Sequence, residues 1–335
     1  METKNIIFCC KSISVWLKSY ISNVNLVYKV YIRDNYNAKS IKELVLNKYN
    51  KNIKIFFLSN HDTLLEDYEI SEMLRKNGIP TMCQSTTTLV NTTDKIKMKE
   101  FLNKNDIATI QWFKNVKGNM KEVVVKKRYG TLGQNMRYYK KINQITLNDE
   151  YVERFQDGKE YSINLYEDQS RKCIIFPAVY KGYTGRNMIH PSRKIRLCTK
   201  NQNSMKEVSI MKKIARRISF LLGNIGFMEI EFIINNLGEI NVLEINPRVS
   251  GTLRMASMAS NCKCFDLMLK NTESGELSCV TNTAEIPYHG EEGCDENNNI
   301  YYTSRATFSF NSRNEYNKKI DIIKKREDIG IKCLI

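Results

Sequence analysis

Acidic and amide side chains recur on two neighbouring segments, each of which alternates apolar and polar residues. The pattern predicts a β-hairpin with strands at 227–234 and 239–245 and a turn at 235–238. Alternation puts the polar side chains of each strand on one face, where antiparallel pairing can bring both sets together: Glu229 and Glu231, then Glu244 and Asn246. Such oxygen donors suit a hard cation such as Mg²⁺, which usually binds one or two carboxylates together with substrate phosphates. The alternative is a polar face that water alone covers.

The end of this hairpin resembles the metal-binding end of ATP-grasp enzymes, which typically carry Glu-x-Asn-x-Arg after an acid or amide on the neighbouring strand. The matching residues are Glu231, Glu244, Asn246 and Arg248. The resemblance implies that the first three hold two Mg²⁺ ions, or Mn²⁺, against the phosphates of ATP. It also implies that Arg248 faces the transferring phosphoryl group, because its charged fork matches phosphate oxygens. Glu229 either supports the site or faces the substrate, or the register is shifted by two residues.

A second motif lies upstream, where a buried strand at 123–126 delivers Lys126 and a loop follows at 127–136. By the same resemblance, Lys126 contacts the nucleotide and joins Arg248 as a catalytic residue. The loop can bring backbone N–H groups to phosphate oxygens, and its candidates are Gly130, Thr131 and Gly133. Three positions depart from the family pattern, which makes the loop stiffer or shorter in reach: Lys127, Leu132 and Asn135.

Two further segments complete the resemblance. The stretch 151–163 resembles the hinge that holds the adenine, so Glu153, Arg154 and Gln156 are the expected adenine contacts, partly through the main chain. Glu160 is then the ribose acceptor. A simpler interpretation is a strand, a turn at 157–158 and a second strand with surface acids. A helix that Thr93 or Asp94 can cap follows residue 91 and carries Lys95, which by resemblance reaches the phosphates from the opposite side.

Composition limits the classes of protein that remain. The 335 residues, 42% of them hydrophobic, can form two or three modest domains. No apolar run approaches the roughly 18 to 20 residues of a membrane span, so we expect a cytoplasmic protein without membrane contact. The ten cysteines form no CxxC pair, which indicates thiols. The net charge of +16 is spread along the chain, so we expect no nucleic-acid partner. A local basic excess at 181–200 fits an anion site: Lys181, Arg186, Arg193, Lys194, Arg196 and Lys200.

The order of expected elements predicts an α/β fold of the α+β ATP-grasp kind, in which a small parallel-sheet domain precedes two lobes that clamp the nucleotide. In the first part, strands at 6–9, 27–32 and 53–58 alternate with helices at 11–21 and 64–76, which favours a parallel sheet. Later elements are a core helix over 208–222, a strand at 301–310 and a charged helix at 314–327. The expected domains are 1–90, 91–149 (first lobe), 150–275 (second lobe with the metal site) and 276–335 (a segment that completes or covers the second lobe).

The resemblance implies an ATP-dependent ligase of the carboxylate-amine or amino-acid ligase branch, similar also to the ATP-binding domain of carbamoyl-phosphate synthase. ATP would convert a carboxylate into an acyl phosphate, which an amine then attacks. The expected partners are small carboxylates and amines, amino acids among them, with a homodimer as one form of assembly. Two alternatives remain: phosphorylation of bicarbonate, as in carbamoyl-phosphate synthase or biotin carboxylase, and a nucleotide-binding regulator without catalysis.

Overall fold

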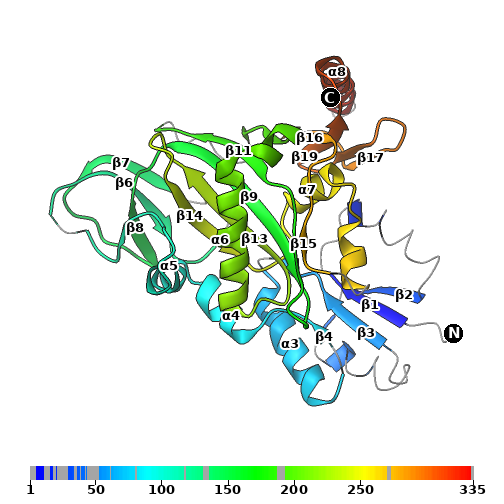
Figure 1. Ribbon diagram of the computed structural model, residues 1–335, viewed down its shortest axis with the longest axis horizontal. Helices are drawn as coiled ribbons and strands as arrows, with labels where there is room; N and C mark the ends of the chain where they lie inside the picture. The colour runs from blue at the N-terminus through cyan, green and yellow to red at the C-terminus, as the bar shows by residue number, and fades with distance from the viewer. Residues whose placement is uncertain are drawn as a thin grey trace.

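The computed structural model describes residues 5–10, 16–17, 20, 29–33, 36–37, 39–41, 43, 53–60, 62–79, 81–116, 118–130, 136–186, 193–269 and 273–332 (Figure 1). Most of the helix expected at 11–21 lies outside these residues. Four residues of the phosphate loop also lie outside them: Thr131 and Gly133, and Leu132 and Asn135, which depart from the family pattern. Within the described part of the chain, no helix combines the length and the apolar character needed to cross a membrane.

The first unit is a parallel sheet with a helix on it. Its strands pair in the order β2-β1-β3-β4, all parallel, which confirms the expectation drawn from alternating strands and helices. The elements are β1 (Asn5–Cys9), β2 (Lys29–Arg33), β3 (Ile53–Phe57), α3 (Leu64–Lys76) and β4 (Thr81–Met82). Helix α3 buries Ile70 and Leu74 against Ile7 and Ile55 of the sheet, so one apolar stripe fixes its position.

A second, antiparallel sheet pairs in the order β5-β8-β6-β7. Its strands are β5 (Trp112–Phe113), β6 (Met120–Lys127), β7 (Arg137–Ile142) and β8 (Glu150–Arg154), and two helices precede it, α4 (Thr86–Thr92) and α5 (Lys95–Lys104). Asp94 caps α5, because its carboxylate accepts from the backbone N–H groups of Ile96 and Lys97. Strand β8 pairs with β6, so residues 150–154 belong to the sheet of the expected first lobe. The division into domains otherwise stays a prediction.

The largest sheet spans the second half of the chain and is antiparallel except where β10 pairs with β15. Its path runs β14-β13-β9-β11-β12-β16-β19-β18-β17. The strands are β9 (Gly158–Glu167), β10 (Cys173–Ile175), β11 (Val179–Thr184), β12 (Arg196–Cys198), β13 (Gly226–Ile234), β14 (Ile240–Asn246), β15 (Gly275–Glu276), β16 (Asn282–Pro287), β17 (Gly293–Asp295), β18 (Ile300–Tyr302) and β19 (Arg305–Phe310). The single strand expected at 301–310 is wrong: the chain reverses at 303–304, and β18 and β19 pair antiparallel.

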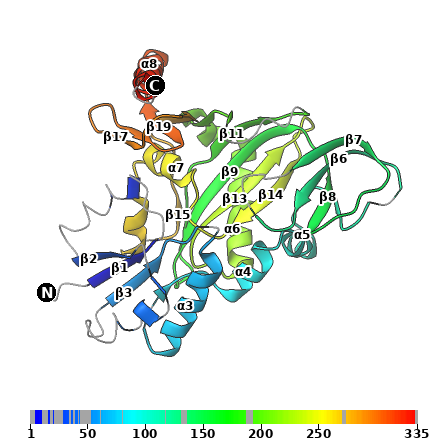
Figure 2. The same cartoon turned by 180° about the vertical axis from the view of Figure 1, so that it is seen from behind.

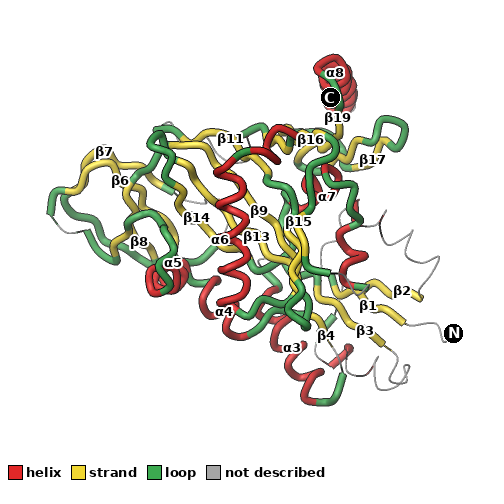
Figure 3. The backbone as a smooth tube through the Cα atoms, in the orientation of Figure 1, coloured by secondary structure: helices red, strands yellow, loops and turns green. Residues whose placement is uncertain are grey.

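Helices cover this sheet and join the units. They are α6 (Lys206–Leu222), α7 (Leu253–Ala259) and α8 (Arg313–Lys332), with 3₁₀ turns at Lys200–Ser204 and Cys264–Met268. Helix α6 lies across β9 and β13 (Figure 3), because its stripe of Val208, Met211, Ala215, Ile218 and Leu222 is buried there. It ends at Gly223, whose φ of 65° is left-handed and favours glycine.

The hairpin edge meets the small antiparallel sheet. Strand β14 lies beside β6 and β8 in the view from behind (Figure 2). Thr109, just before β5, bridges to Val242 of β14, and the Thr109 hydroxyl donates to the Val242 carbonyl at 2.8 Å. The two sheets are therefore joined at the edge that carries the acidic motif.

Candidate active site

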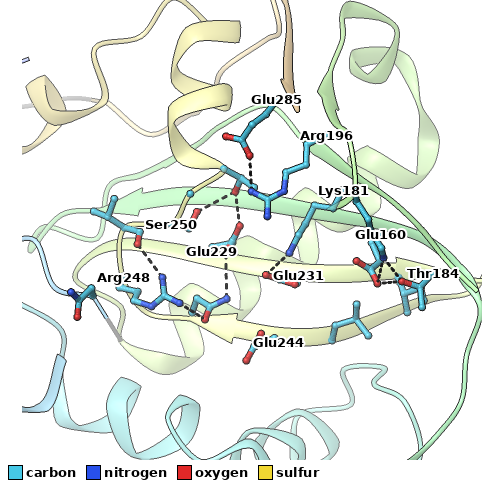
Figure 4. A pocket seen from close by; sticks show the side chains of 18 of the residues that line it. Glu160, Lys181, Thr184, Arg196, Glu229, Glu231, Glu244, Arg248, Ser250 and Glu285 are labelled. Atoms are coloured by element: carbon cyan, nitrogen blue, oxygen red, sulfur yellow. Dashed lines mark hydrogen bonds and ion pairs between the residues drawn. The ribbon is translucent and has the colours of Figure 1, made fainter. Parts of the chain in front are cut away.

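A cavity of about 600 Å³ lies where the units meet, and this volume is typical of small-molecule sites. Its walls come from the loop after β3, the end of β8, the β13–β14 hairpin and the strands β16 and β19. Among the described residues that line it, basic side chains outnumber carboxylates by nine to six. Figure 4 shows the side chains of the hairpin pointing into this space. The surplus of positive charge fits an anionic ligand.

The hairpin brings the predicted metal ligands together in the predicted register. Glu231 of β13 lies directly opposite Glu244 of β14, and Glu229 lies opposite Asn246. A β-bulge follows, because Phe232 pairs with Val242 and leaves Leu243 as an extra residue. All four polar side chains line the cavity. Their convergence is thus confirmed, without the two-residue shift in register, while their role in binding metal stays a prediction.

Glu231 and Glu244 each lie beside one lysine. Lys181 Nζ of β11 lies 2.5 Å from Glu231 Oε1, and Lys95 Nζ of α5 lies 3.3 Å from Glu244 Oε1. Burial by itself lowers the pKa of Lys181, but the charge of Glu231 outweighs it and raises that pKa above its usual value. Burial likewise raises the pKa of Glu231, and Lys181 more than reverses this. Glu231 is therefore held in its ionised form and attracts cations.

Asn246 and Arg248 are held by neighbours on the same strand end. Asn246 Nδ2 donates to Glu229 Oε2 at 3.2 Å, and Arg248 Nη2 donates to Asn246 Oδ1 at 3.2 Å. Glu229 also accepts from the Thr252 hydroxyl at 2.5 Å and is 4% exposed. Glu229 thus holds Asn246 and the loop after β14, while its role toward the substrate stays a prediction. The free edge of Arg248 faces the cavity.

The donor chemistry of Glu231, Glu244 and Asn246 fits a small hard cation. Two carboxylates and one amide oxygen are fewer ligands than Mg²⁺ requires, so phosphate oxygens and water would complete the shell, as is usual for this ion. Nowhere among the described residues are three His, Cys, Asp or Glu side chains grouped as a self-sufficient metal site. The hairpin therefore fits a metal that arrives with a phosphate ligand rather than one held by the protein alone.

Lys126 reaches the cavity from the end of β6 and is oriented from behind by a buried carboxylate. Its Nζ lies 2.5 Å from Glu153 Oε2, and the other oxygen of Glu153 lies 2.8 Å from Lys99 Nζ. Burial raises the pKa of Glu153, but the two lysines outweigh it and bring that pKa to about 2. Because Glu153 is 1% exposed and bound to both lysines, its carboxylate positions Lys126, and any contact of Glu153 with adenine falls to its main chain.

The hinge residues lie at the mouth of the same cavity. Glu160 accepts a hydrogen bond from the Thr184 hydroxyl and lies 3.3 Å from Lys194 Nζ, so its carboxylate is fixed at the cavity wall. The Arg154 side chain turns to the Lys121 carbonyl, at 2.9 Å, and leaves its main chain at the cavity with that of Gln156. Gly158 starts β9, where a Cβ atom would lie 2.2 Å from the Ile234 carbonyl oxygen. Glycine alone fits this close approach.

The phosphate loop is described only in part. Gly130 is exposed, and its φ of 103° lies in the region that favours glycine. Lys95 is the first residue of α5 and lines the same cavity as Lys126. Both lysines therefore line the cavity, while their approach to the phosphates from opposite sides and their contacts with nucleotide stay predictions.

A cluster of arginines around Glu285 was missed from the sequence. Glu285 of β16 accepts from Arg305 Nε at 2.6 Å, Arg196 Nη1 at 2.8 Å and Arg254 Nη2 at 3.0 Å. The Thr307 hydroxyl adds a fourth bond at 2.9 Å. Burial raises the pKa of Glu285, but the three guanidinium groups reverse the shift and bring that pKa to about 2. All four charged residues line the cavity.

One member of this cluster, Arg196, belongs to the local basic excess that the sequence showed. The basic excess at 181–200 included Lys181, Lys194 and Arg196, which line the cavity. Its other members lie elsewhere: Arg186 pairs with Glu122 at 2.7 Å, and Arg193 and Lys200 are exposed. Glu285 and Arg305 come from the C-terminal strands, where nothing local marks them as functional.

Residues 92–252 match the family model of the ATP-grasp domain. The chain carries an ATP-grasp domain. A carbamoyl-phosphate synthase of Methanobrevibacter smithii is 24% identical over 242 residues, which are 68% of this chain and 65% of that protein. The chain thus spans less than two thirds of the length of this curated relative.

Solved ATP-grasp enzymes share the fold over nearly the whole chain. Biotin carboxylase from Campylobacter jejuni, solved as its β,γ-ATP complex, has a TM-score of 0.71 at 13% identity and covers 97% of this chain and 91% of its own. The L-amino acid ligase of Bacillus licheniformis has a TM-score of 0.69 at 14% identity, with coverage of 97% and 98%. At such identities the likeness establishes the fold alone, and it confirms the predicted ATP-grasp architecture.

Proposed function

We propose that this protein is an ATP-dependent ligase that joins a carboxylate to an amine and releases ADP and phosphate. The observation that carries the proposal is the convergence of Glu231, Glu244 and Asn246 beside Arg248, with Lys126 across the same cavity. The match of residues 92–252 to the ATP-grasp domain supports ATP as the nucleotide. A cytoplasmic location suits such an enzyme.

The proposed reaction needs charge neutralisation more than a protein nucleophile. A carboxylate oxygen of the substrate attacks the γ-phosphorus of ATP, the bond to the β,γ-bridging oxygen breaks, and ADP leaves with that oxygen. The amine then attacks the acyl phosphate, phosphate leaves, and the nitrogen loses one proton. Arg248 and Lys126 would offset the charge that gathers on the transferring group. Lys126 enters this role already charged, since Glu153 raises its pKa despite burial.

Glu231, Glu244 and Asn246 would hold Mg²⁺, or Mn²⁺, in this scheme. The bound ion would neutralise phosphate oxygens and orient the triphosphate. The chain's own part is to keep Glu231 ionised, which Lys181 does. The single lysine on each carboxylate is a replaceable partner, because both Glu231 and Glu244 are partly exposed to the cavity.

Phosphorylation of bicarbonate is the second candidate. The observation that favours it is the sequence similarity of 24% to a carbamoyl-phosphate synthase over 242 residues. A nucleotide-binding regulator is a weaker candidate, because the acidic hairpin and both lysines stand in place.

The test uses ATP, Mg²⁺ and pooled L-amino acids whose carboxylates carry ¹⁸O. The proposal expects free phosphate that contains one ¹⁸O atom, and a hydroxamate when hydroxylamine is added, because both derive from an acyl phosphate. Unlabelled phosphate, formed only when bicarbonate is present, would favour the second candidate. Pyrophosphate in place of phosphate, or nucleotide binding without turnover, would contradict the proposal.

A further inference from the structure

Most carboxylates that line the cavity pair with a lysine, whereas one contacts a group of arginines. Four carboxylates each have a lysine within 3.3 Å at the cavity: Glu153 with Lys126, Glu160 with Lys194, Glu231 with Lys181 and Glu244 with Lys95. Glu285 instead holds three guanidinium groups, those of Arg196, Arg254 and Arg305. Among the described residues, one carboxylate thus contacts three guanidinium groups, which makes this wall rich in positive charge.

Hydrogen bonding within the cluster is also incomplete. Arg254 is 8% exposed, lines the cavity, and its Nε has no hydrogen-bond partner in the described structure. A buried, unpaired donor on a charged group is costly, so a ligand that accepts from it would be stabilised. Glu285 cannot supply this bond, because both its oxygens already accept from arginines and from Thr307.

The cluster adjoins the predicted site of phosphoryl transfer. In Figure 4, Arg196 extends from Glu285 toward Glu229 and Lys181. Arg196, Glu229 and Glu231 all line this cavity. An anion held by the arginines would therefore lie beside the hairpin and within the same cavity.

We propose that the arginines around Glu285 bind the carboxylate of the amine substrate, so that this substrate is an α-amino acid rather than ammonia or an uncharged amine. Planar guanidinium forks match the two oxygens of a carboxylate. Binding by this group fixes the amino nitrogen at short reach from the acyl phosphate. The inference rests on the proposed ligase function and names the class of its second substrate.

The apolar part of the cavity favours an organic carboxylate over bicarbonate. Trp16, Leu58 and Phe265 line the same space, and the rings of Trp16 and Phe265 lie 5.2 Å apart. Such a wall can bury the side chain of an amino acid, which contributes through the hydrophobic effect. A bicarbonate ion has no apolar surface to place there.

The experiment measures binding without turnover. Full-length protein saturated with Mg²⁺ and a non-hydrolysable ATP analogue is titrated calorimetrically with each of the common L-amino acids, with the matching decarboxylated amines, and with bicarbonate. We expect at least one amino acid to bind about 10- to 100-fold more tightly than its amine, the range that a charged hydrogen bond supplies. Arg254→Gln and the less buried Arg196→Gln should each weaken that binding about tenfold.

The control is Arg216→Gln, a half-buried residue of α6 outside the cavity lining, whose guanidinium group lies 3.6 Å from Glu276. Analogue affinity and circular dichroism show whether each variant is folded. Equal affinity for amine and amino acid, binding of bicarbonate alone, binding of no amino acid, or unchanged amino-acid affinity in both folded arginine variants would overturn the inference. Since no turnover is needed, amino-acid binding without catalysis would count against the ligase function and not against this subsite.

Discussion

The hairpin carboxylates and Glu285 line one cavity but differ in their exposure to it and in the number of cationic side chains that they contact. Glu231 and Glu244 keep 18% and 25% of their side chains exposed, and each faces a single lysine. Glu285 is 1% exposed and is enclosed by three arginines. A partly exposed carboxylate with one flexible partner can exchange it for a metal ion, whereas an enclosed one cannot. The hairpin carboxylates can therefore bind a cation directly. Glu285 instead holds three arginines in place, and those arginines can bind an anion.

The largest expected effect is on turnover at the hairpin. Glu244→Ala removes a proposed metal ligand from a partly exposed position, so steady-state turnover should fall by about 1000-fold or more, the scale of losing an electrostatic stabiliser. The melting temperature should stay within a few degrees, because little packing is lost. Glu239→Ala, at the exposed turn of the same hairpin, is the matched control and should keep full turnover. Wild-type turnover in Glu244→Ala would contradict the proposed difference between the hairpin carboxylates and Glu285.

The complementary change at Glu285 should act on stability first. Glu285→Gln keeps the shape but removes the negative charge that three guanidinium groups share, which costs about 3 kcal/mol of the free energy of unfolding. Chemical denaturation followed by circular dichroism measures this loss. If Glu285→Gln proved as stable as the wild type, the arginines would not depend on this carboxylate, and the comparison would fail.

A smaller effect, on the KM for ATP, is expected from changing Lys99, which helps to position Lys126. Lys99 is fully buried and shares Glu153 with Lys126, and its ammonium also donates to the Thr109 hydroxyl at 2.7 Å. Burial lowers the pKa of Lys99, with partial compensation from Glu153. Lys99→Met should raise the KM for ATP up to about tenfold with little change in kcat, since it loosens the positioning of Lys126. A fall in kcat at unchanged KM would contradict a positioning role.

The smallest effect concerns acid stability. The folded-state pKa values of Glu153 and Glu285 are about 2, against an ordinary 4.5. Because these values are depressed, the stability that they contribute is complete above pH 4.5 and is lost as the pH falls toward 2. The free energy of unfolding, measured by denaturant titration, should show this loss in the wild type and less of it in Glu285→Gln. An identical pH profile for both proteins would rule out the assigned pKa of Glu285.

Local pattern and long-range assembly differ in how far the sequence predicts them. The hairpin was predictable because alternation and one turn decide which of its side chains share a face, and Glu231 does lie opposite Glu244. The start of α5, for which Asp94 was one of two candidate caps, and the span of α3 followed from equally local signals. Contacts within short segments need no knowledge of the fold.

The arginine cluster could not be predicted because its members come from distant parts of the chain. Arg196 lies 89 positions from Glu285, and the two meet only because β12 pairs with β16. The orienting role of Glu153 was missed for a similar reason: Lys99 comes from α5, far from Glu153 in the sequence. Strand order in a large antiparallel sheet is set by the packing of the whole molecule, and no local periodicity encodes it.

The most direct test of the central claim is the Mg²⁺ dependence of nucleotide affinity. The account predicts that Mg²⁺ strengthens binding of a non-hydrolysable ATP analogue to the wild type by about 100-fold relative to EDTA, and that Glu231→Gln with Glu244→Gln abolishes this gain. Calorimetric titration measures all four affinities. An equal gain from Mg²⁺ in the double variant would show that the hairpin carboxylates do not hold the metal, and it would contradict the account.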